Sequence, residues 1–284
     1  MKTAVYRYNL PYLEDFMWPN NEKCAVLLTF DFDAELLWAT TYPRTPSYLS
    51  RGQYGARVGV PRILELLQRY GVVATFFVPG ATAENYPHLV EQIAAAGHEI
   101  GHHGYLHEYP NQLSREEERD VLAKGFAALE KVVGKRPLGY RSPAWDLSPN
   151  SLQLFKEAGF LYDSSLMADD FQPYPLEVDG ETTDIVEIPV AWELDDAPYY
   201  LFNFHPYRAG LSSPSHVYEI WSSEFDGAYR YGGVYTLTMH PQISGRFHRL
   251  QMLEKLIQYM INHSGTWFTT CSQVAQICQT NWQK

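Results

Sequence analysis

The sequence has little of what several large classes of protein require. It contains three cysteines in 284 residues and no Cys-x-x-Cys pair, so neither a disulfide framework nor a thiolate metal site is expected. No segment approaches the ~20 consecutive apolar residues of a membrane span, and residues 1–9 lack the apolar stretch of a secretory signal. We therefore expect no membrane partner and a cytoplasmic location.

Basic residues are also fewer than acidic ones. The chain carries 22 Lys and Arg against 33 Asp and Glu, a formal net charge of −11, and no run of basic residues is longer than two. Nucleic acids and anionic membranes are themselves negative, so neither is an expected partner. A hydrophobic content of 45% excludes global disorder, and 15% aromatic residues provide ring surface for a core or a cleft.

What the chain does contain is a repeated pattern of a short apolar run, a loop and an amphipathic helix, as in parallel β/α units. We expect strands at residues 24–30, 74–78, 98–101, 138–141, 160–162, 185–192, 234–239 and 266–269. We expect helices at residues 61–70, 87–96, 114–133, 148–159, 214–221, 246–261 and 273–279, and an irregular segment at 169–183. The pattern predicts a single α/β catalytic domain over residues 1–284. Its expected form is a distorted or incomplete (β/α) barrel of about seven strands with an insertion at residues 195–231.

Polar residues gather where these strands end, and parallel α/β folds place their active sites at the carboxyl ends of strands. The first strand runs into Thr-Phe-Asp-Phe-Asp at residues 29–33. Residues two apart in an extended chain face the same side, so we expect Asp31 and Asp33 to project together and Phe32 to face the other way. If the two carboxylates are close together, a cation or an arginine is needed to offset their repulsion. Taken alone, however, the pair is explained more simply as two solvated acids at a turn.

Four histidines fall within residues 98–107 of a chain that has ten in all. His103 and His107 are four apart, a spacing that places both imidazoles on one side of a helical turn. With Asp33 they would form a set of two histidines and one carboxylate that leaves metal positions open for water and substrate. Zinc fits these ligands, and iron, cobalt, nickel and manganese are alternatives. A plain surface cluster of histidines is the competing explanation.

Two further strand ends carry Arg141 and His240. An arginine at a buried strand end requires a carboxylate partner. A single histidine after a strand is more often structural than functional. Because polar residues also follow the other strands, we expect His240 to have a role in the same site.

In this order the motifs resemble the polysaccharide deacetylase, or NodB-homology, family of metal-dependent hydrolases, over about residues 24–277. The first motif of that family is usually Thr-Phe-Asp-Asp-Gly. By position, the resemblance implies Asp31 as the catalytic base and Asp33 as a metal ligand. The family's His-x-x-x-His motif implies His103 and His107 as the other two ligands.

The remaining motifs of the family imply the remaining roles. The Arg-x-Pro motif matches Arg141 and Pro143, so the resemblance implies that Arg141 holds the base and that a backbone N–H near Ala144 helps to bind the oxyanion. The terminal histidine motif matches His240, which implies a general acid.

Three departures from the family's motifs leave the substrate open. Phe32 separates the two aspartates, Ala144 followed by Trp145 stands where a tyrosine is usual, and the family's Asp-Trp motif has no clear match. The candidates for the acidic partner of the terminal histidine are Asp195, Asp196 and Asp163. We expect Asp195.

The strings at residues 51–60 and 239–246 are similar to a subgroup that includes cyclic-imide and allantoin hydrolases beside peptidoglycan deacetylases. The resemblance implies a homodimer or homotetramer. Three functions follow from it: removal of acetyl from an N-acetylated sugar, opening of a cyclic imide or ureide ring in a small molecule, and a non-catalytic carbohydrate- or metal-binding module. The first is our prediction, because Trp38, Trp145 and Trp192 could stack on the rings of an oligosaccharide, although core packing is the commoner use of such side chains. The missing export signal and the altered motifs favour the second.

Overall fold

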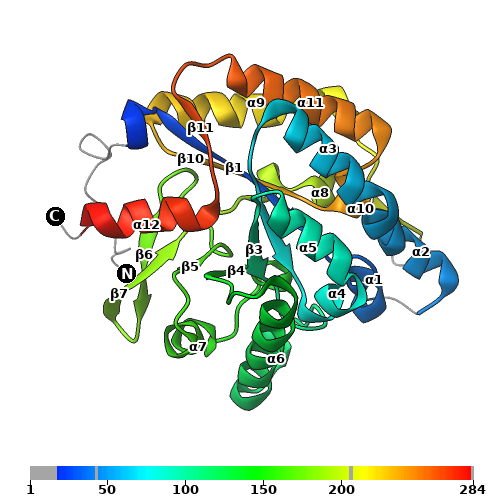
Figure 1. Cartoon of the computed structure of the whole chain (residues 1–284), viewed down its shortest axis with the longest axis vertical. Coiled ribbons are helices and arrows are strands. Elements are labelled where there is room, and N and C mark those ends of the chain that lie inside the picture. The colour runs from blue at the N-terminus through cyan, green and yellow to red at the C-terminus, as the bar shows by residue number, and fades with distance from the viewer. Residues whose placement is uncertain (1–17, 42–43, 205–206, 283–284) are drawn as a thin grey trace, which may run out of the picture.

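The apolar runs form one curved sheet, as the computed structural model of the chain shows (Figure 1). The structure describes residues 18–41, 44–204 and 207–282, so residues 1–9, which bear on the predicted absence of a signal, lie outside the described residues. The strands of the sheet are β1 (Cys24–Asp31), β2 (Thr75–Val78), β3 (Glu99–His102), β4 (Gly139–Tyr140), β5 (Tyr162–Asp163), β6 (Tyr174–Val178), β7 (Glu181–Glu187), β10 (Val234–Met239) and β11 (Thr266–Phe268).

Neighbouring strands follow the order β10-β1-β2-β3-β4-β5-β7-β6, and β11 pairs with the start of β1. Every pairing from β10 to β7 is parallel, and β6 is antiparallel to β7. Parallel strands are usually covered on both faces, and all eight residues of β1 are buried. The prediction of an incomplete (β/α) barrel is confirmed: seven strands make the parallel path, and β6 and β11 are added to it.

Helices surround the sheet on its outer side (Figure 1). The α6 helix illustrates why they begin and end where they do: Ser114 and Glu117 form the capping box at its start, and Gly134 ends it with a φ of 75°. The helices are α1 (Leu36–Thr41), α2 (Pro46–Tyr54), α3 (Val60–Tyr70), α4 (Gly80–Asn85), α5 (Pro87–Ala95), α6 (Arg115–Val133), α7 (Ser151–Ala158), α8 (Asp196–Tyr200), α9 (Pro214–Tyr231), α10 (Pro241–Ser244), α11 (Phe247–Ile261) and α12 (Cys271–Trp282). Among the helices of the described ranges, none has the length and apolar character to cross a membrane.

The expectation of an irregular segment at residues 169–183 was wrong. This part of the chain forms the β6–β7 hairpin, which turns at Asp179 (φ 54°) and Gly180 (φ 81°). An Asp-Gly pair with positive φ at both residues is a strong local indication of a two-residue hairpin. The strand expected at 185–192 therefore begins earlier and ends at Glu187.

The insertion at residues 195–231 contains more structure than the single helix expected at 214–221. It holds α8, a short hairpin of β8 (Phe202–Asn203) and β9 (Arg208–Ala209), and α9, which continues to Tyr231 and ends at Gly232 with a φ of 81°.

The two strings that resemble the subgroup, residues 51–60 and 239–246, pack against each other. Between α2 and α3 the chain forms a π-helical turn, Gly55–Gly59. A Cβ atom on Gly59 would lie 2.2 Å from the carbonyl oxygen of Pro241, and one on Gly245 would lie 2.5 Å from the Cα of Gly59. Only glycine allows this close approach of the π-helical turn to α10.

Candidate active site

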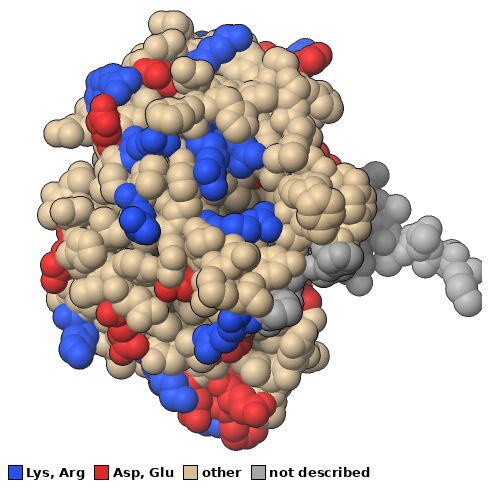
Figure 2. Space-filling model, turned by 90° about the vertical axis from the view of Figure 1, so that its right-hand side faces the viewer, with Lys and Arg blue, Asp and Glu red and all other residues tan. Residues whose placement is uncertain are grey.

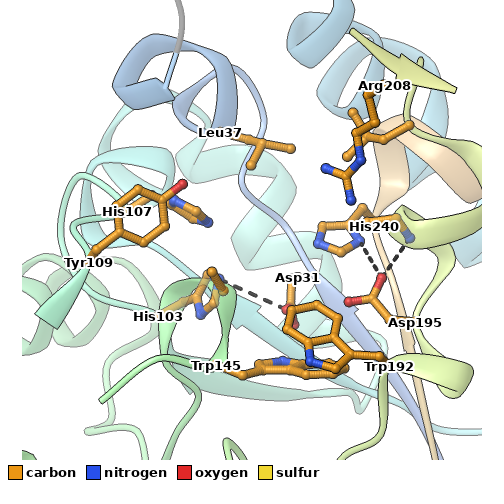
Figure 3. A pocket seen from close by; sticks show the side chains of 13 residues that line it. Asp31, Leu37, His103, His107, Tyr109, Trp145, Trp192, Asp195, Arg208 and His240 are labelled. Atoms are coloured by element: carbon orange, nitrogen blue, oxygen red, sulfur yellow. Dashed lines mark hydrogen bonds and ion pairs between the residues drawn. The ribbon is translucent and has the colours of Figure 1, made fainter. Parts of the chain in front are cut away.

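The carboxyl ends of β1, β3, β4 and β10 surround one pocket, which most of the predicted site residues line (Figure 3). Asp33 and Arg141 are not in its described lining, but they contact His103 and Asp31, which are. Asp31 closes β1 and Asp33 follows two residues later, and both side chains face the same group of histidines. Phe32 is fully buried in the hydrophobic core. The period of two in an extended chain therefore accounts for this part of the site.

Three donor side chains converge on one point. Asp33 Oδ1 lies 3.4 Å from His103 Nε2 and 3.8 Å from His107 Nε2, and one donor atom from each residue lies within 4.8 Å of the others. The second nitrogen of His103 is already used, because Nδ1 donates to the carbonyl oxygen of Arg141 at 2.6 Å. This bond turns Nε2 toward Asp33, as the outer hydrogen bond of a metal-binding histidine does.

The same three residues fit a divalent cation. Burial alone would raise the pKa of Asp33, but the attraction of His107, His103 and His240 outweighs it and lowers that pKa to about 2. The carboxylate is thus ionised and fully buried, yet its Oδ1 has no hydrogen-bonding partner among the described residues. A buried unpaired anionic oxygen is costly, and a cation bound between it and two imidazoles would remove that cost.

The expectation that His103 and His107 share one side of a helical turn was wrong. The segment after β3 is a loop, with positive φ at Gly104 (73°) and His107 (64°). The loop, and not a helix, brings the rings to a centroid distance of 5.2 Å. Gly104 signalled this departure, since glycine favours left-handed backbone and disfavours helix interiors.

Arg141 is fully buried and held from several sides. Its Nη1 donates to Asp31 Oδ1 at 3.1 Å and to Thr29 Oγ1 at 2.6 Å. Its Nε and Nη2 donate to the carbonyl oxygen and the hydroxyl of Ser164, at 3.1 and 2.8 Å. A planar guanidinium with this many partners has one orientation. Asp31 is the carboxylate that a buried arginine at this strand end required.

His240 has a different acidic partner from the one predicted. Its Nδ1 lies 2.7 Å from Asp196 Oδ1 and 3.8 Å from Asp195 Oδ1. Asp196 Oδ2 also accepts the backbone N–H of His240 at 2.9 Å and the hydroxyl of Ser244. The hydrogen-bonding partner is therefore Asp196, and the choice of Asp195 was wrong.

Local geometry explains why the two neighbouring acids differ. Asp195 is the N-cap of α8, and its Oδ1 accepts the backbone N–H of Ala197 at 2.6 Å. Asp196, the first residue of α8, instead accepts hydrogen bonds from His240 and from Ser244 of α10. The third candidate, Asp163, ends β5 opposite Glu187 and accepts a hydrogen bond from Ser165.

The Asp196 contact has an electrostatic consequence for His240. Burial alone would lower the pKa of its imidazole, but Asp196, then Asp195 and Asp33, raise it well above the ordinary value. The ring is thus charged at neutral pH, with Nδ1–H donating to Asp196 and Nε2 facing the site at 3.8 Å from Asp33 Oδ2. A protonated histidine at this place can give a proton to a substrate atom.

The pocket around these groups has a volume of about 160 Å³. Ala144 and Trp145 line it, in a turn where both have positive φ (55° and 54°). Trp145 packs on the half-exposed Trp192 with ring centroids 4.3 Å apart. The described lining also includes residues that the sequence did not single out, namely Leu37, Tyr109, Ala197, Leu201 and Arg208.

Trp38 does not line this pocket. Its side chain is 2% exposed and belongs to the hydrophobic core. Trp38 therefore contributes to core packing and does not stack on a ligand in this pocket.

Comparison with known proteins gives concordant results. The family model described as "Polysaccharide deacetylase" matches residues 19–162. A peptidoglycan deacetylase of Helicobacter pylori is 36% identical over 271 residues, which cover 86% of this chain and 92% of that protein.

Solved structures agree with this assignment. A Mycobacterium smegmatis protein described as a polysaccharide deacetylase is similar with a TM-score of 0.87 and 40% identity, over 93% of each chain. A structure of Puue allantoinase is similar with a TM-score of 0.84 and 25% identity, over 99% of this chain and 97% of that one. The chain therefore belongs to the polysaccharide deacetylase family and is a hydrolase of carbon–nitrogen bonds other than peptide bonds.

Proposed function

We propose that the protein uses a divalent metal, of which zinc is the first candidate, to remove the acetyl group from an N-acetylated sugar. One observation carries the proposal: a carboxylate held by Arg141 and a charged imidazole held by Asp196 each approach the same donor set. Asp31 Oδ2 lies 4.0 Å from His103 Nε2, and His240 Nε2 lies 3.8 Å from Asp33 Oδ2. A base and an acid on one reacting centre are what amide hydrolysis requires.

Asp33, His103 and His107 would hold the metal. When bound, such an ion polarises a carbonyl oxygen and lowers the pKa of a bound water toward ~7. The hydrogen bond from His103 Nδ1 to Arg141 and that from Gln242 Nε2 to Asp33 Oδ2, at 3.3 Å, orient two of the three ligands.

Asp31 would remove a proton from the attacking water. Its Oδ1 is bound by Arg141 at 3.1 Å, which leaves Oδ2 for the proton and prevents the carboxylate from rotating away. The backbone N–H near Ala144, on the pocket wall, would stabilise the oxyanion that forms at the carbonyl carbon.

His240 would protonate the departing nitrogen through Nε2. The proton is available because Asp196 keeps the ring charged. After the C–N bond breaks, the products are acetate and a free amine, and Asp196 holds the imidazole in place for the next cycle.

The opening of a small cyclic amide, imide or ureide ring is a second candidate, supported by the size of the pocket. A cavity of about 160 Å³ is close to one that holds a single benzene ring, and smaller than the ~300 Å³ at which pockets for larger ligands begin. The similarity to an allantoinase structure supports the same candidate.

A metal test separates this mechanism from one without metal. Prolonged chelation is expected to abolish hydrolysis, and stoichiometric addition of zinc, and separately of iron, cobalt, nickel or manganese, to restore it. Full activity in protein shown by elemental analysis to be metal-free would refute the metal's role.

A substrate panel decides between the two candidates. Acetate release from chitooligosaccharides and peptidoglycan fragments is measured beside ring opening of succinimide, hydantoin and allantoin, with the same metal-loaded protein. Acetate release alone supports the first candidate, and ring opening alone supports the second. The Asp31→Asn variant, run in parallel, shows whether any turnover comes from this site.

A further inference from the structure

A second cavity lies beside the active site, on the face of the molecule that α2, α10 and α11 form. We name it the arginine pocket and define it by Arg51, Arg246, Arg249 and His248, with Trp38 and Tyr200 in its wall. Its volume is about 360 Å³, and the described residues that line it include no Asp or Glu. Figure 2 shows Lys and Arg side chains gathered around a hollow on this face. A concentration of positive charge is unusual in a chain of net charge −11.

Arg249 is the buried member of this group. It is 7% exposed, its Nη1 donates to the carbonyl oxygen of Ile243 at 3.0 Å, and its guanidinium lies 4.3 Å from the ring centre of Tyr200. Its Nε has no hydrogen-bonding partner within the described part of the chain. A buried charged donor without an acceptor is costly, and negative charge bound in the cavity that Arg249 lines would offset part of that cost.

The other basic side chains add charge around Arg249. Arg246 is exposed and lies 3.6 Å from the ring centre of Tyr54. Arg51 is oriented by Asn203 Oδ1 at 2.5 Å and the carbonyl oxygen of Phe202 at 2.6 Å. Burial lowers the pKa of Arg249, and Arg246 lowers it further, against the attraction of Asp196 and Tyr200. The positive charge of this pocket is therefore only partly compensated.

We propose that the arginine pocket binds a small organic anion, with its carboxylate or phosphate group on Arg249 and Arg246 and its apolar part against Tyr200. Guanidinium groups bind both kinds of oxyanion through paired hydrogen bonds. A volume of about 360 Å³ is within the range of sites for small organic molecules.

This site is separate from the catalytic pocket but shares structure with it. Leu201 lines both cavities. Gln242 lines the arginine pocket, and its Nε2 donates to Asp33 Oδ2. The hydrolytic mechanism does not require a ligand in the arginine pocket. Anion binding there can therefore be tested independently of the proposed substrate.

Titration calorimetry on the full-length, metal-loaded protein tests it. Phenyl phosphate and benzoate distinguish a phosphate from a carboxylate as the bound group, and inorganic phosphate shows how much affinity comes from the oxyanion alone. We expect measurable binding, and a loss of at least about tenfold in affinity in Arg246→Gln, the cost of one charge-assisted contact. Arg230→Gln, which removes the same charge from α9 outside this pocket, should leave the affinity unchanged. Arg249→Gln, which removes the other guanidinium of the proposed site, provides a second variant, should Arg246→Gln fail to fold.

Three results would overturn the proposal. The first is the absence of binding by any of the three anions at about 10 mM, ten times the Kd of a weak, 1 mM site. The second is an unchanged affinity in both Arg246→Gln and Arg249→Gln, which would place the anion elsewhere, such as on the metal. The third combines two measurements: the parent protein binds no anion, and Arg246→Gln has a different oligomeric mass in sedimentation. That result would mean that a second copy of the chain covers the pocket.

Discussion

His240 Nδ1 lies 2.7 Å from Asp196 Oδ1, and this contact joins the end of β10 to α8, at the start of the insertion. Asp195, one residue earlier, is 3.8 Å from the same nitrogen and instead caps α8. The two acids differ in what they do although they are adjacent in the chain.

The Asp196→Asn variant is expected to lower kcat by about 10²–10⁴-fold, the usual contribution of a positioned acid. An amide does not stabilise the charged ring, and Asn keeps only one acceptor oxygen. It therefore loses either the acceptor of His240 Nδ1–H or the oxygen that His240 N–H and Ser244 share. Asp195→Asn keeps the Oδ1 that caps α8 and should cost far less. Steady-state kinetics of the two variants, with melting curves to show that both fold, check this. A larger loss in Asp195→Asn would reverse the assignment of the partner.

Substitutions at Asp31 and His107 should separate turnover from metal binding. We expect Asp31→Asn to retain metal and to lose about 10²–10⁴-fold in kcat, because the base is removed while the donor set is intact. His107→Ala should lose metal, because one of three ligands is gone. Elemental analysis and kinetics on the same samples measure both effects. Equal metal loss in the two variants would contradict the division of roles between the base Asp31 and the metal ligand His107.

The close contact at Gly59 predicts a stability effect. A Cβ atom there would lie 2.2 Å from the carbonyl oxygen of Pro241, so we expect Gly59→Ala to destabilise the protein by about 1–3 kcal/mol, the usual cost of overpacking. Gly227→Ala is the matched control, because a Cβ on Gly227, inside α9, meets no atom within 4 Å. That change should be neutral or stabilising. Thermal melting compares them, and an equal response of the two sites would refute the packing argument.

The buried carboxyl pair Asp163 and Glu187 predicts a dependence of stability on pH. Burial raises the pKa of Glu187 well above its ordinary value, with Asp163 adding to the effect, and burial raises the pKa of Asp163 to about 6. A raised folded-state pKa means that the folded chain binds more protons than the unfolded chain. The stabilisation is therefore present below about pH 4 and is lost as the pH rises to about 6 and beyond.

Glu187→Gln tests this dependence. The neutral amide can donate to Asp163 while its oxygen still accepts the N–H groups of Ser165 and Leu166. The melting temperature of the variant, relative to the parent protein, should rise as the pH increases from 4 to 8. A constant difference across that range would show that the pair does not hold an extra proton.

Local rules were sufficient wherever the answer lay within one element. The alternation of an extended chain placed Asp31 and Asp33 together, and the capping box predicted the start of α6. The Asp179-Gly180 turn could have been predicted by the same rules, since its dipeptide is a hairpin indicator. The arginine at the end of β4 also allowed a correct prediction: a buried guanidinium requires a carboxylate, and Arg141 contacts Asp31.

The sequence by itself thus determined the order of the β/α units, the polar residues at their ends and the family of the chain. Only the tertiary structure decided which acid meets His240 and that Trp38 belongs to the core. The arginine pocket also arises only in the fold. The physical reason is separation along the chain: Asp196 and His240 are 44 residues apart, and Arg51 and Asn203 are 152 apart. Contacts at such distances depend on how whole elements pack, which no periodicity of neighbouring residues specifies.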